Sequence, residues 1–581
     1  MSILKNDSKL QLPSKVDILV LGSGSAGMTA ALTSSLLGLD VIVAEKTAKI
    51  GGTTAYSAGS IWVPNSRHNK TSEDSYDNAF KYLRNAIGNG IDEERIGSFL
   101  LFAPKMVDFL EEKTCVKLRA YSYHPDYLSN LAGATLSGRV LEPIPFRGSV
   151  LKKNFVDLRY PIPEFMLFNK IMVDRTDINN LMSISKKWSS LWYSIKLFAQ
   201  YGLDRILYNR GTRLVMGNAL VGRLYYSLLE NKVPVLLSTE ATSLKLDNNK
   251  VISAILNYKG LPKEIKVEYG IILATGGFSN QPELRRNLMP NSLLNNSPVV
   301  DSATGDGFSL AKKIGGYLSL TYESNSFLAP ASKRSRPDGS IAVFPHFVLD
   351  RGKPGAIAID PNGKRFVNEA TTYHLFGKAL LETLENFPDS SCYLICDHNF
   401  IKKYGLGMIR PYGIGLSSSI RDGYVKKANS FEKLGYKINV PFNNLESTIS
   451  RHNSFVKSGI DEDFEKGKDA YQKNLGDPLN LPNPCLGMLK KPPFYAVEIF
   501  PCDIGASAGL ATNSSAQVLK GNGIPINGLY ACGNDMKSIM EGKYPGPGVT
   551  IGAAMTFGFI AANHAHELKT KKTDSNKEKS K

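Results

Sequence analysis

Tyr544 and Gly548, near the end of the chain, belong to the run Tyr-Pro-Gly-Pro-Gly. Pro545 and Pro547 stiffen this turn, so that the tyrosine hydroxyl and the glycine N–H can both donate to one carbonyl oxygen. The apolar run from 549 to 562 follows at once, and proline is common where helices begin, so a helix N-terminus should point at the same place. The motif predicts a site that polarises a ketone, although a plain Pro/Gly turn has the same letters.

A second motif lies at the other end of the chain. An apolar strand from 16 to 21 runs into a GxGxxG fingerprint at Gly22, Gly24 and Gly27, a helical pattern follows, and a second strand from 40 to 44 ends at Glu45. Glycines in this context provide the tight turn, access to a pyrophosphate and close helix packing, and the acidic residue takes ribose hydroxyls. This order of elements predicts a dinucleotide site.

Three later segments favour FAD over NAD. The small-residue loop from 46 to 59 follows the second strand directly, a strand ends in Ala-Thr-Gly-Gly at 274–277, and a late strand ends in Gly-Asn-Asp at 533–535. The loop from 51 to 60 has no histidine to which a flavin could be attached, so we expect non-covalent FAD. The residues expected to contact it are Gly22, Gly24, Ser25, Ala26, Gly27, Glu45, Lys46, Gly52, Thr53, Thr54, Ser57, Gly59, Ala241, Thr275, Gly276, Gly277, Gly533, Asn534, Gly546, Gly548, Thr550 and Ile551.

These elements must be positioned by a fold of the α/β class. We expect a Rossmann-like FAD-binding domain with a parallel sheet, into which an α+β catalytic capping domain is inserted. The expected limits are an N-terminal tail at 1–15, the FAD-binding domain at 16–296 with a helical insertion at about 150–230, the catalytic domain at 297–490, the second part of the FAD-binding domain at 491–567 and a basic disordered tail at 568–581.

Composition fits a large globular enzyme, with 581 residues, 42% hydrophobic and 21% charged. The net charge of +17 comes with no nucleic-acid motif, and six lysines against two acidic residues lie in the last thirteen positions. A solvated surface is therefore expected, with attraction to an anionic membrane as the second option. The first fifteen residues are polar and resemble no signal peptide, so we expect a cytoplasmic protein that is either free or peripherally attached to a membrane.

Neither the cysteines nor the longest late apolar stretch predicts a further site. The six cysteines form no CxxC pattern, so no metal site is expected. The run from 549 to 562 is shorter than the ~20 residues that cross a bilayer. Residues 165 to 230 look helical, with Trp188, Trp192, Ile195 and Phe198 among their apolar positions; a packed helix pair and a face for a membrane or an apolar substrate both fit this pattern.

From about 16 to 567 the chain resembles the FAD-dependent 3-ketosteroid dehydrogenases of the fumarate reductase flavoprotein superfamily. The most specific segments are Tyr-His-Pro-Asp-Tyr at 123–127, the segment starting Gly-Arg at 138–146, the segment from 354 to Tyr373, and the turn at 544–548. The resemblance implies that Tyr373 takes a proton from C2, that Tyr127 is its hydrogen-bonding partner, and that Tyr544 and the Gly548 amide hold the C3 ketone. A hydride from C1 would then reach flavin N5.

The resemblance leaves the particular substrate and product open. The segment from 147 to 223 favours a 1-dehydrogenase, with a 3-ketosteroid 4-(5α)-dehydrogenase as the alternative and a fumarate-type reductase, using Arg351, Arg365 and His374, as a weaker one. Departures at 327–330, 505–509 and 541–543 leave the particular 3-ketosteroid undefined. The electron acceptor is not identified, a quinone being one candidate.

Overall fold

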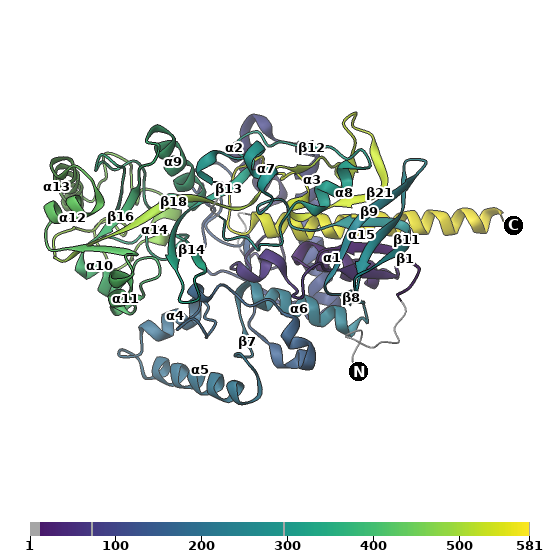
Figure 1. Cartoon of the computed structure of the whole chain (residues 1–581), viewed down its shortest axis with the longest axis horizontal. Coiled ribbons are helices and arrows are strands. Elements are labelled where there is room, and N and C mark those ends of the chain that lie inside the picture. The colour runs from purple at the N-terminus through teal and green to yellow at the C-terminus, as the bar shows by residue number, and fades with distance from the viewer. Residues whose placement is uncertain (1–11, 71–73, 294–296, 580–581) are drawn as a thin grey trace.

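The computed structural model describes residues 12–70, 74–293 and 297–579, and two sheets dominate it (Figure 1). The larger sheet has eight strands. Its parallel part is formed, in spatial order, by β8 (Val235–Leu236), β2 (Val41–Ala44), β1 (Lys15–Leu21), β11 (Leu261–Leu273) and β21 (Pro525–Ala531). The antiparallel strands are β9 (Thr239–Asp247), β10 (Lys250–Tyr258) and β20 (Gln517–Leu519). Central strands such as β1 read as continuous apolar runs because both faces of a parallel sheet are covered.

Helices cover this sheet and connect it to the rest of the molecule. α1 (Ser25–Leu36) follows β1 and packs against both α6 (Met216–Glu230) and the long α15 (Val549–Lys579), which in turn packs on α3 (Glu93–Lys113). Ten residues of α1 are buried, which explains its small, apolar sequence. The α/β fold class predicted from the sequence is confirmed.

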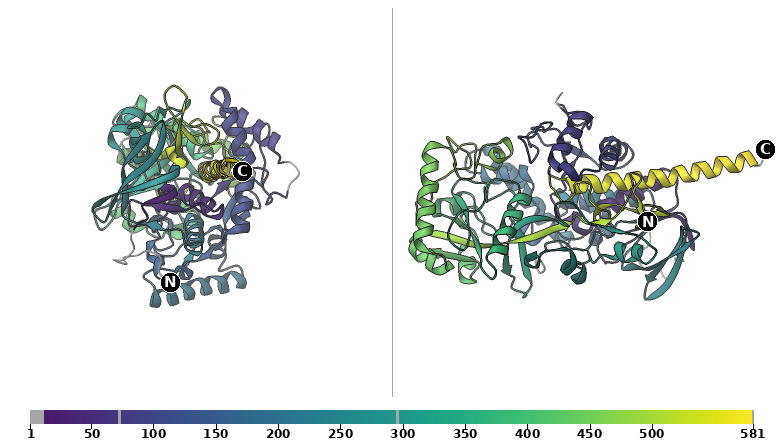
Figure 2. Two further views of the ribbon diagram at one scale, coloured as in Figure 1. Left: turned by 90° about the vertical axis from the view of Figure 1, so that its right-hand side faces the viewer. Right: turned by 90° about the horizontal axis from the view of Figure 1, so that it is seen from above.

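The C-terminal segment differs from the expectation of a disordered tail at 568–581. α15 begins at Val549, as expected, but runs on to Lys579 and projects from the body of the protein (Figure 2). Lys569 Nζ lies 2.8 Å from an Asp17 carboxylate oxygen, and Lys572 Nζ lies 2.5 Å from Glu268. Lysine is also a good helix former, so ion pairs and propensity together extend the helix. Of the expected N-terminal tail at 1–15, residues 1–11 lie outside the described residues.

The second sheet is antiparallel and forms the unit at the left of Figure 1. Its strands are β14 (Ile341–Pro345), β13 (Ser326–Ser335), β18 (Phe494–Ala506), β16 (Cys392–Cys396), β15 (Ala356–Ile359) and β17 (Val425–Ala428). Its helices are α9 (Tyr373–Asn386), α10 (His398–Lys403), α11 (Leu416–Arg421), α12 (Phe431–Ile438), α13 (Phe442–Ser458) and α14 (Ala470–Leu475).

The limits of this second sheet differ from the expected catalytic domain at 297–490. The sheet begins with β13 at Ser326 and ends with β18 at Ala506. Before it, α8 (Asp306–Lys312) packs on β9, and β12 (Leu318–Ser319) pairs with β19 (Gly509–Leu510). We therefore propose a catalytic unit close to 326–506, because the thirteen-residue β18 pairs with β16 and β17 at its start and with β13 at its end.

A helical pair at the lower edge of Figure 1 lies within the segment from about 150 to 230 that was expected to be an insertion. α4 (Arg175–Met182) carries a capping box of Asp174 and Asp177, and Arg213 pairs with both carboxylates. α5 (Trp188–Leu207) buries Ser190, Ser194, Leu197 and Asp204, whereas its opposite face is open to solvent. No helix among the described residues is long and apolar enough to cross a membrane.

Smaller elements complete the two units. They are α2 (Tyr76–Ile87), α7 (Pro282–Leu288), β3 (Ile61–Trp62), β4 (Leu118–Ala120), β5 (Val140–Pro143), β6 (Phe146–Arg147), β7 (Arg213–Leu214) and the 3-10 helices η1 (Gly52–Tyr56), η2 (Gly88–Gly90), η3 (Gly148–Asp157), η4 (Pro163–Phe165), η5 (Asn291–Leu293), η6 (Pro411–Gly413) and η7 (Gly533–Asp535).

Candidate active site

The end of β1 forms a cradle of small residues. Gly22 adopts φ +108°, and a Cβ at this position would lie 2.2 Å from the Ala274 carbonyl oxygen, so only glycine fits. At the start of α1, Thr54 Oγ1 accepts a hydrogen bond from Ser25 N (3.2 Å) and donates one to Ser25 Oγ (3.0 Å). The fingerprint turn and the loop from 46 to 59 are thus held together along one edge of the sheet.

Glu45 lies at the end of β2, where a ribose would be recognised. Its Oε2 accepts hydrogen bonds from the Ser23 backbone N–H (3.1 Å) and hydroxyl (2.6 Å), and its Oε1 accepts two from Thr47 at 2.9 Å. A carboxylate has about four lone-pair positions, so these four contacts fix its orientation and compete with ribose hydroxyls. Neither Ser23 nor Thr47 is a defining residue of the glycine fingerprint, so their contacts with Glu45 could not be predicted from it.

Two further carboxylates brace the cradle. Asp535 accepts hydrogen bonds from the Thr275 N–H, the Thr275 hydroxyl (2.9 Å) and the Gly277 N–H (2.9 Å), which fixes the Ala-Thr-Gly-Gly turn. Lys46 Nζ lies 2.5 Å from both Asp306 and the Thr304 hydroxyl. Desolvation raises the pKa of Asp535 despite these donors. Asp535 belongs to the Gly-Asn-Asp motif that the sequence analysis identified, whereas Asp306 belongs to no motif that was recognised there.

One cavity of about 1810 Å³ joins this cradle to the second unit. Single-ligand pockets are usually about 300–1,000 Å³, so there is room for a dinucleotide and a second molecule. The predicted residues that line it are Gly22, Gly24, Ser25, Ala26, Glu45, Lys46, Gly52, Thr53, Thr54, Ser57, Gly59, Ala241, Thr275, Gly276, Gly533, Asn534, Thr550, Ile551, Tyr127, Tyr373, Tyr544 and Gly548.

Three predicted residues lie behind the cavity wall instead. A Cβ at Gly27 would meet the Gly22 carbonyl oxygen, one at Gly277 would meet Asn534, and one at Gly546 would meet the Trp62 ring. They permit close packing of the wall and do not face the cavity. The residues that do line it, small at the fingerprint and acidic at the end of β2, fit a flavin dinucleotide.

Tyr127, Tyr373 and Tyr544 meet at one end of the cavity although they come from three distant segments. Ring centroids lie 5.5 Å apart for Tyr127 and Tyr373, 5.2 Å for Tyr373 and Tyr544, and 6.0 Å for Tyr127 and Tyr544. Tyr373 begins α9, whose N-cap Thr372 accepts a hydrogen bond from the Leu375 N–H. The Tyr373 hydroxyl interacts with those of both other tyrosines.

Burial dominates the electrostatics of this cluster. Desolvation raises the pKa of Tyr373 well above its usual value, and the neighbouring Tyr127 and Tyr544 raise it further. Desolvation also raises the pKa of Tyr544, against interactions with Thr550 and Tyr373 that lower it. The Tyr544 and Thr550 hydroxyl oxygens lie 3.3 Å apart. These phenols therefore keep their protons and remain able to donate, and any of them needs help to act as a base.

Gly548 directly precedes α15 and lines the same cavity as Tyr544. Its φ is +86°, and a Cβ there would lie 2.3 Å from the Ser60 carbonyl oxygen, so this turn also requires glycine. The first N–H groups of a helix have no intrahelical partner and carry positive potential. Thr550 and Ile551, in the first turn, line the same cavity.

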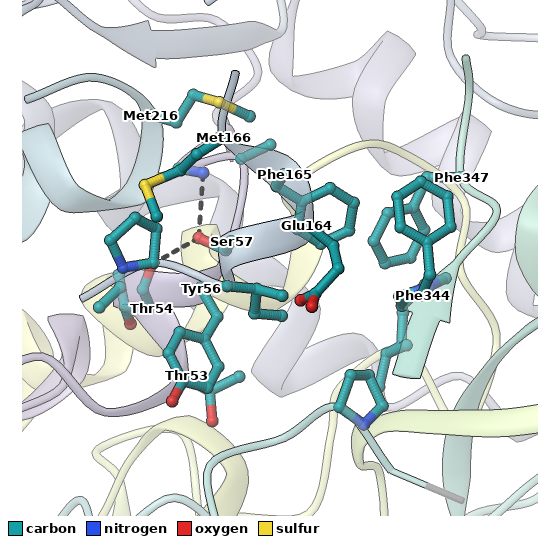
Figure 3. A pocket seen from close by; sticks show the side chains of 18 of the residues that line it. Thr53, Thr54, Tyr56, Ser57, Glu164, Phe165, Met166, Met216, Phe344 and Phe347 are labelled. Carbon is teal, nitrogen blue, oxygen red and sulfur yellow. Dashed lines mark hydrogen bonds between the residues drawn. The ribbon is translucent and has the colours of Figure 1, made fainter. Parts of the chain in front are cut away.

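Aromatic side chains build the wall between the tyrosines and the outside. Phe165, Phe344 and Phe347 face the loop that contains Thr53 and Ser57 (Figure 3). Phe165 packs on Phe344 with centroids 5.1 Å apart, and Phe347 packs on Tyr373 at 4.9 Å. This wall suits a flat apolar ligand whose polar end reaches the tyrosines. None of the three phenylalanines belongs to a motif that was recognised in the sequence. Phe165 comes from the segment expected to be a helical insertion.

The residues considered for a fumarate-type site do not form one. Arg365 pairs with Glu369 and Asp461, each at 2.8 Å, His374 Nδ1 accepts a hydrogen bond from the Leu328 N–H, and Arg351 is fully buried. None of these three side chains lines the cavity within the described residues. A dicarboxylate clamp is therefore not present in the described arrangement.

Tyr471 was missed by the sequence analysis. Its ring lies 4.7 Å from that of Tyr127, on the side away from the cavity, and it is 1% exposed. It stands in a polar segment without a recognisable motif, and only the packing of α14 against the loop after Tyr127 brings it here, where the Tyr471 N–H donates to Ser129.

Comparisons with known proteins agree with this geometry. The family described as "FAD binding domain" matches residues 17–551. A 3-oxosteroid 1-dehydrogenase of Mycolicibacterium smegmatis is 34% identical over 94% of this chain and 96% of that protein. A 4-oxocyclohex-2-ene-1-carboxylate 5-dehydrogenase of Sinomonas cyclohexanicum is 32% identical over 95% and 94%.

A solved structure extends the likeness to the fold. The 3-ketosteroid delta1-dehydrogenase of Sterolibacterium denitrificans, crystallised in complex with 1,4-androstadiene-3,17-dione, has a TM-score of 0.89 and 32% identity, and the match covers 96% of this chain and all of that one. FAD is the cofactor of this fold. The chain therefore belongs to the family of FAD-dependent 3-ketosteroid dehydrogenases.

Proposed function

We propose that this protein removes two hydrogens from C1 and C2 of a 3-ketosteroid, leaving a 1,2 double bond. The convergence of Tyr127, Tyr373 and Tyr544 at an aromatic-walled end of the cavity carries the proposal. Relatives named for this reaction, matching over nearly their whole length, support it. Bound FAD would accept the hydride that leaves C1.

The chain's own residues would prepare the substrate for that transfer. The Tyr544 hydroxyl and the Gly548 N–H donate to the C3 ketone oxygen, which makes the C2 proton acidic because the developing enolate is stabilised. Tyr373 takes that proton and Tyr127 holds the Tyr373 hydroxyl in place. Phe165, Phe344 and Phe347 exclude water from the rings, and the low dielectric strengthens both donors.

FAD would be held by the cradle at the end of β1 without a covalent bond. Glu45, braced by Ser23 and Thr47, would take ribose hydroxyls, and the first turn of α1 would face the pyrophosphate. Acid precipitation should then leave the yellow colour in the supernatant. Glu45→Ala should lower the FAD content of purified protein, and a pellet that keeps its colour would contradict non-covalent binding.

A small cyclic keto acid is the second candidate substrate, because the Sinomonas relative is named for one. Most cations near the aromatic wall are already paired: Arg336 with Glu164 (2.7 Å) and Arg334 with Asp422 (2.6 Å). Arg175, which lines the cavity and lies over the Tyr121 ring at 5.7 Å, is the group that could take such a carboxylate. The cavity volume favours the larger ligand.

Anaerobic mixing decides between these substrates. Purified protein is combined with a panel of 3-ketosteroids and with 4-oxocyclohexanecarboxylate while flavin absorbance is followed, and the products are analysed for the position of the double bond. Bleaching with a ketosteroid and a new 1-ene supports the proposal. Bleaching with the keto acid alone supports the second candidate, and a 4-ene product would indicate the 4-(5α)-dehydrogenase.

We also propose that α5 rests on an anionic membrane surface. Trp188, Trp192, Leu203, Ile206 and Leu207 are between 62% and 79% exposed, which is the apolar face expected of a helix lying in the interface. Lys187, Lys196 and Arg205 are exposed on the same helix and suit anionic lipids. Phe198 of α5 also lines the cavity, so an apolar substrate could enter from lipid, where a quinone acceptor would also be met.

Tryptophan fluorescence tests this surface directly. Two of the three tryptophans lie on α5, and Trp62 is fully buried, so vesicles of anionic lipid should shift the emission to the blue and carry the protein on flotation. Trp188→Ser with Trp192→Ser should abolish flotation, whereas Leu479→Ser with Leu481→Ser, exposed elsewhere at 82% and 81%, should not. Equal flotation of both double variants would contradict the proposal.

A further inference from the structure

Behind the tyrosine cluster lies a fully buried cation. Arg351 is 0% exposed, and its guanidinium donates hydrogen bonds to four backbone carbonyl oxygens: those of His346 (2.8 Å), Phe347 (2.8 Å), Glu369 (2.7 Å) and Thr371 (2.5 Å). Burying a charge is costly unless something compensates it. Such a group is retained where its charge or its geometry is needed.

The carbonyl contacts of Arg351 surround the proposed base. Thr371 precedes Tyr373 by two residues, and Phe347 packs its ring on Tyr373 at 4.9 Å. One guanidinium therefore fixes the segment that leads into α9 and the segment that carries the aromatic wall. Movement of either would displace the Tyr373 hydroxyl.

The charge of Arg351 also faces the tyrosines. It interacts electrostatically with Tyr471 and Tyr127, and Tyr127 interacts with Tyr373. The Tyr471 side chain is fully buried, and its hydroxyl interacts with both the Arg351 guanidinium and the Tyr127 hydroxyl. Arg351, Tyr471, Tyr127 and Tyr373 thus form a series from a fixed cation to the cavity.

Other charged groups around this series do not replace the cation. Burial lowers the pKa of His124 and of His374 to about 4, so both rings are neutral near pH 7. Asp350 is held by His346 at 2.6 Å, Asp469 faces Tyr471 from the start of α14, and the ion pair of Lys378 and Glu323 lies beside His374. Asp469 opposes a phenolate at Tyr471 and Asp350 interacts with Arg351 itself, which leaves Arg351 as the cation of this series that favours the phenolate.

We propose that Arg351, acting through Tyr471 and Tyr127, is the positioning residue that makes Tyr373 basic enough to take the C2 proton. The inference rests on the proposed function. Before the reaction the cluster loses one phenolic proton to solvent, and the negative charge is shared along the series. The C2 proton then forms an O–H bond at Tyr373 while the C–H electron pair enters the enolate, whose oxygen is held by Tyr544 and Gly548.

The pH dependence of kcat/KM in the holoenzyme tests this role. Activity should rise with pH as the cluster ionises. An adjacent cation lowers the pKa of such a group by about one to three units, so Arg351→Met should move the rising limb that far toward higher pH. At pH values below the rising limb, kcat/KM of Arg351→Met should be about tenfold to a thousandfold lower than that of the wild type, and this difference should shrink as pH rises. Arg351→Lys, which keeps the charge, should leave the limb near its original position.

Arg223 provides a matched control. It also donates to three backbone carbonyls, those of Ile144, Cys115 and Pro145, and is 9% exposed, but it is absent from the interactions of the four tyrosines. Arg223→Met should lower thermal stability without moving the limb. If Arg351→Met behaves in the same way, with one constant loss at every pH, Arg351 only holds carbonyls and the proposal is overturned.

Two further measurements keep the inference separate from the choice of substrate and from folding. If Arg351→Met does not fold, Tyr471→Phe should still move the limb upward, and an unmoved limb would refute the proposal. The ketone used is whichever the wild type oxidises. If the wild type oxidises none, the proposed function fails, and a pH titration of tyrosinate absorbance tests the inference instead. The signal to follow is the part of the absorbance that Tyr373→Phe loses. Its pH midpoint in the wild type should lie below that in Arg351→Met, and equal midpoints contradict the inference.

Discussion

At the scale of single residues, the site combines two conflicting demands on tyrosine. Burial strengthens the Tyr544 hydroxyl as a donor to a ketone, because water no longer competes for the oxygen. The same burial raises the pKa of Tyr373 well above its usual value and disfavours the phenolate that must take a proton. The neighbouring Tyr127 and Tyr544 raise that pKa further, and the role that we propose for Arg351 is to supply the positive charge that offsets both effects.

Removing the Tyr373 hydroxyl tests the proposed base. Tyr373→Phe deletes the proton acceptor and little packing volume, so turnover should fall to background while FAD content and steroid binding stay near those of the wild type. Absorbance of the bound flavin and its change on adding steroid measure both properties. Tyr127→Phe should be milder. Near wild-type turnover in Tyr373→Phe would assign the proton to another group that lines the cavity, such as Tyr127.

Removing the Tyr544 hydroxyl tests the ketone site. Tyr544→Phe deletes one of two oxygen donors, and a single well-placed donor is worth ~2.7 to 4 kcal/mol in the transition state. Flavin reduction in stopped flow should therefore slow by about a hundredfold to a thousandfold. Phe327, whose ring lies 5.2 Å from that of Tyr544, offers a neighbouring control: Phe327→Leu keeps both donors and should cost much less. Similar losses in both variants would mean that packing, and not donation, is measured.

At the scale of elements, the sequence predicted what is local. Apolar runs that end in glycine or acidic residues made β1, β2 and β11 recognisable. Because the carboxyl ends of parallel strands meet at one edge of a sheet, the position of the cofactor cradle could be predicted from these strands. The tyrosine cluster is different, because Tyr127, Tyr373, Tyr471 and Tyr544 come from four separate segments. The turn motif supplied Tyr544 and the family resemblance supplied Tyr127 and Tyr373. Tyr471 could not be found, since a six-residue helix in a polar stretch has no periodicity that marks a contact.

The segment that presents Tyr373 depends on a buried ionic cluster, whose removal is a test of stability. Arg365, Glu369, Asp461 and Lys466 are at most 3% exposed in their side chains, and Glu369 contacts both Arg365 (2.8 Å) and Lys466 (3.1 Å). Glu369→Ala leaves two buried cations short of a partner and should cost about 3–5 kcal/mol in the free energy of unfolding. Denaturant titration of the holoenzyme measures this value.

A surface ion pair serves as the control for that measurement. Asp422 pairs with Arg334 at 2.6 Å but is 37% exposed in its side chain, so Asp422→Ala should cost only about 0–1 kcal/mol. Equal losses in the two variants would show that burial of the Glu369 cluster contributes nothing beyond an ordinary ion pair.

At the scale of the whole molecule, the cavity joins two units that each lack half of the site. The first unit provides the cradle, Tyr127 and the turn at 544–548, and the second provides Tyr373 and Phe347 from segments around its sheet. α5 lies at the lower edge of the molecule in Figure 1, Phe198 of this helix lines the cavity, and its other large apolar side chains are exposed. A ketone held at the inner end would therefore place its remaining rings along the aromatic wall, which fixes the edge of the steroid that reacts.

That orientation leads to a prediction about the product. With the C3 oxygen held by Tyr544 and Gly548, we expect Tyr373 to take its proton from C2, in keeping with the relatives named for 1-dehydrogenation, and the product is then a 1-ene. Deuterium at C1 and deuterium at C2 should each slow flavin reduction, if chemistry limits that step. A substrate reduced to the 3-hydroxyl should not react, because the donors then cannot stabilise an enolate. Flavin absorbance in stopped flow measures the rate with each labelled steroid, and mass spectrometry of the products shows which deuterium was lost. A 4-ene formed from a saturated 5α-ketosteroid, with the C1 deuterium retained, would contradict this orientation. It would mean that the base takes its proton from C4 and that the hydride leaves C5.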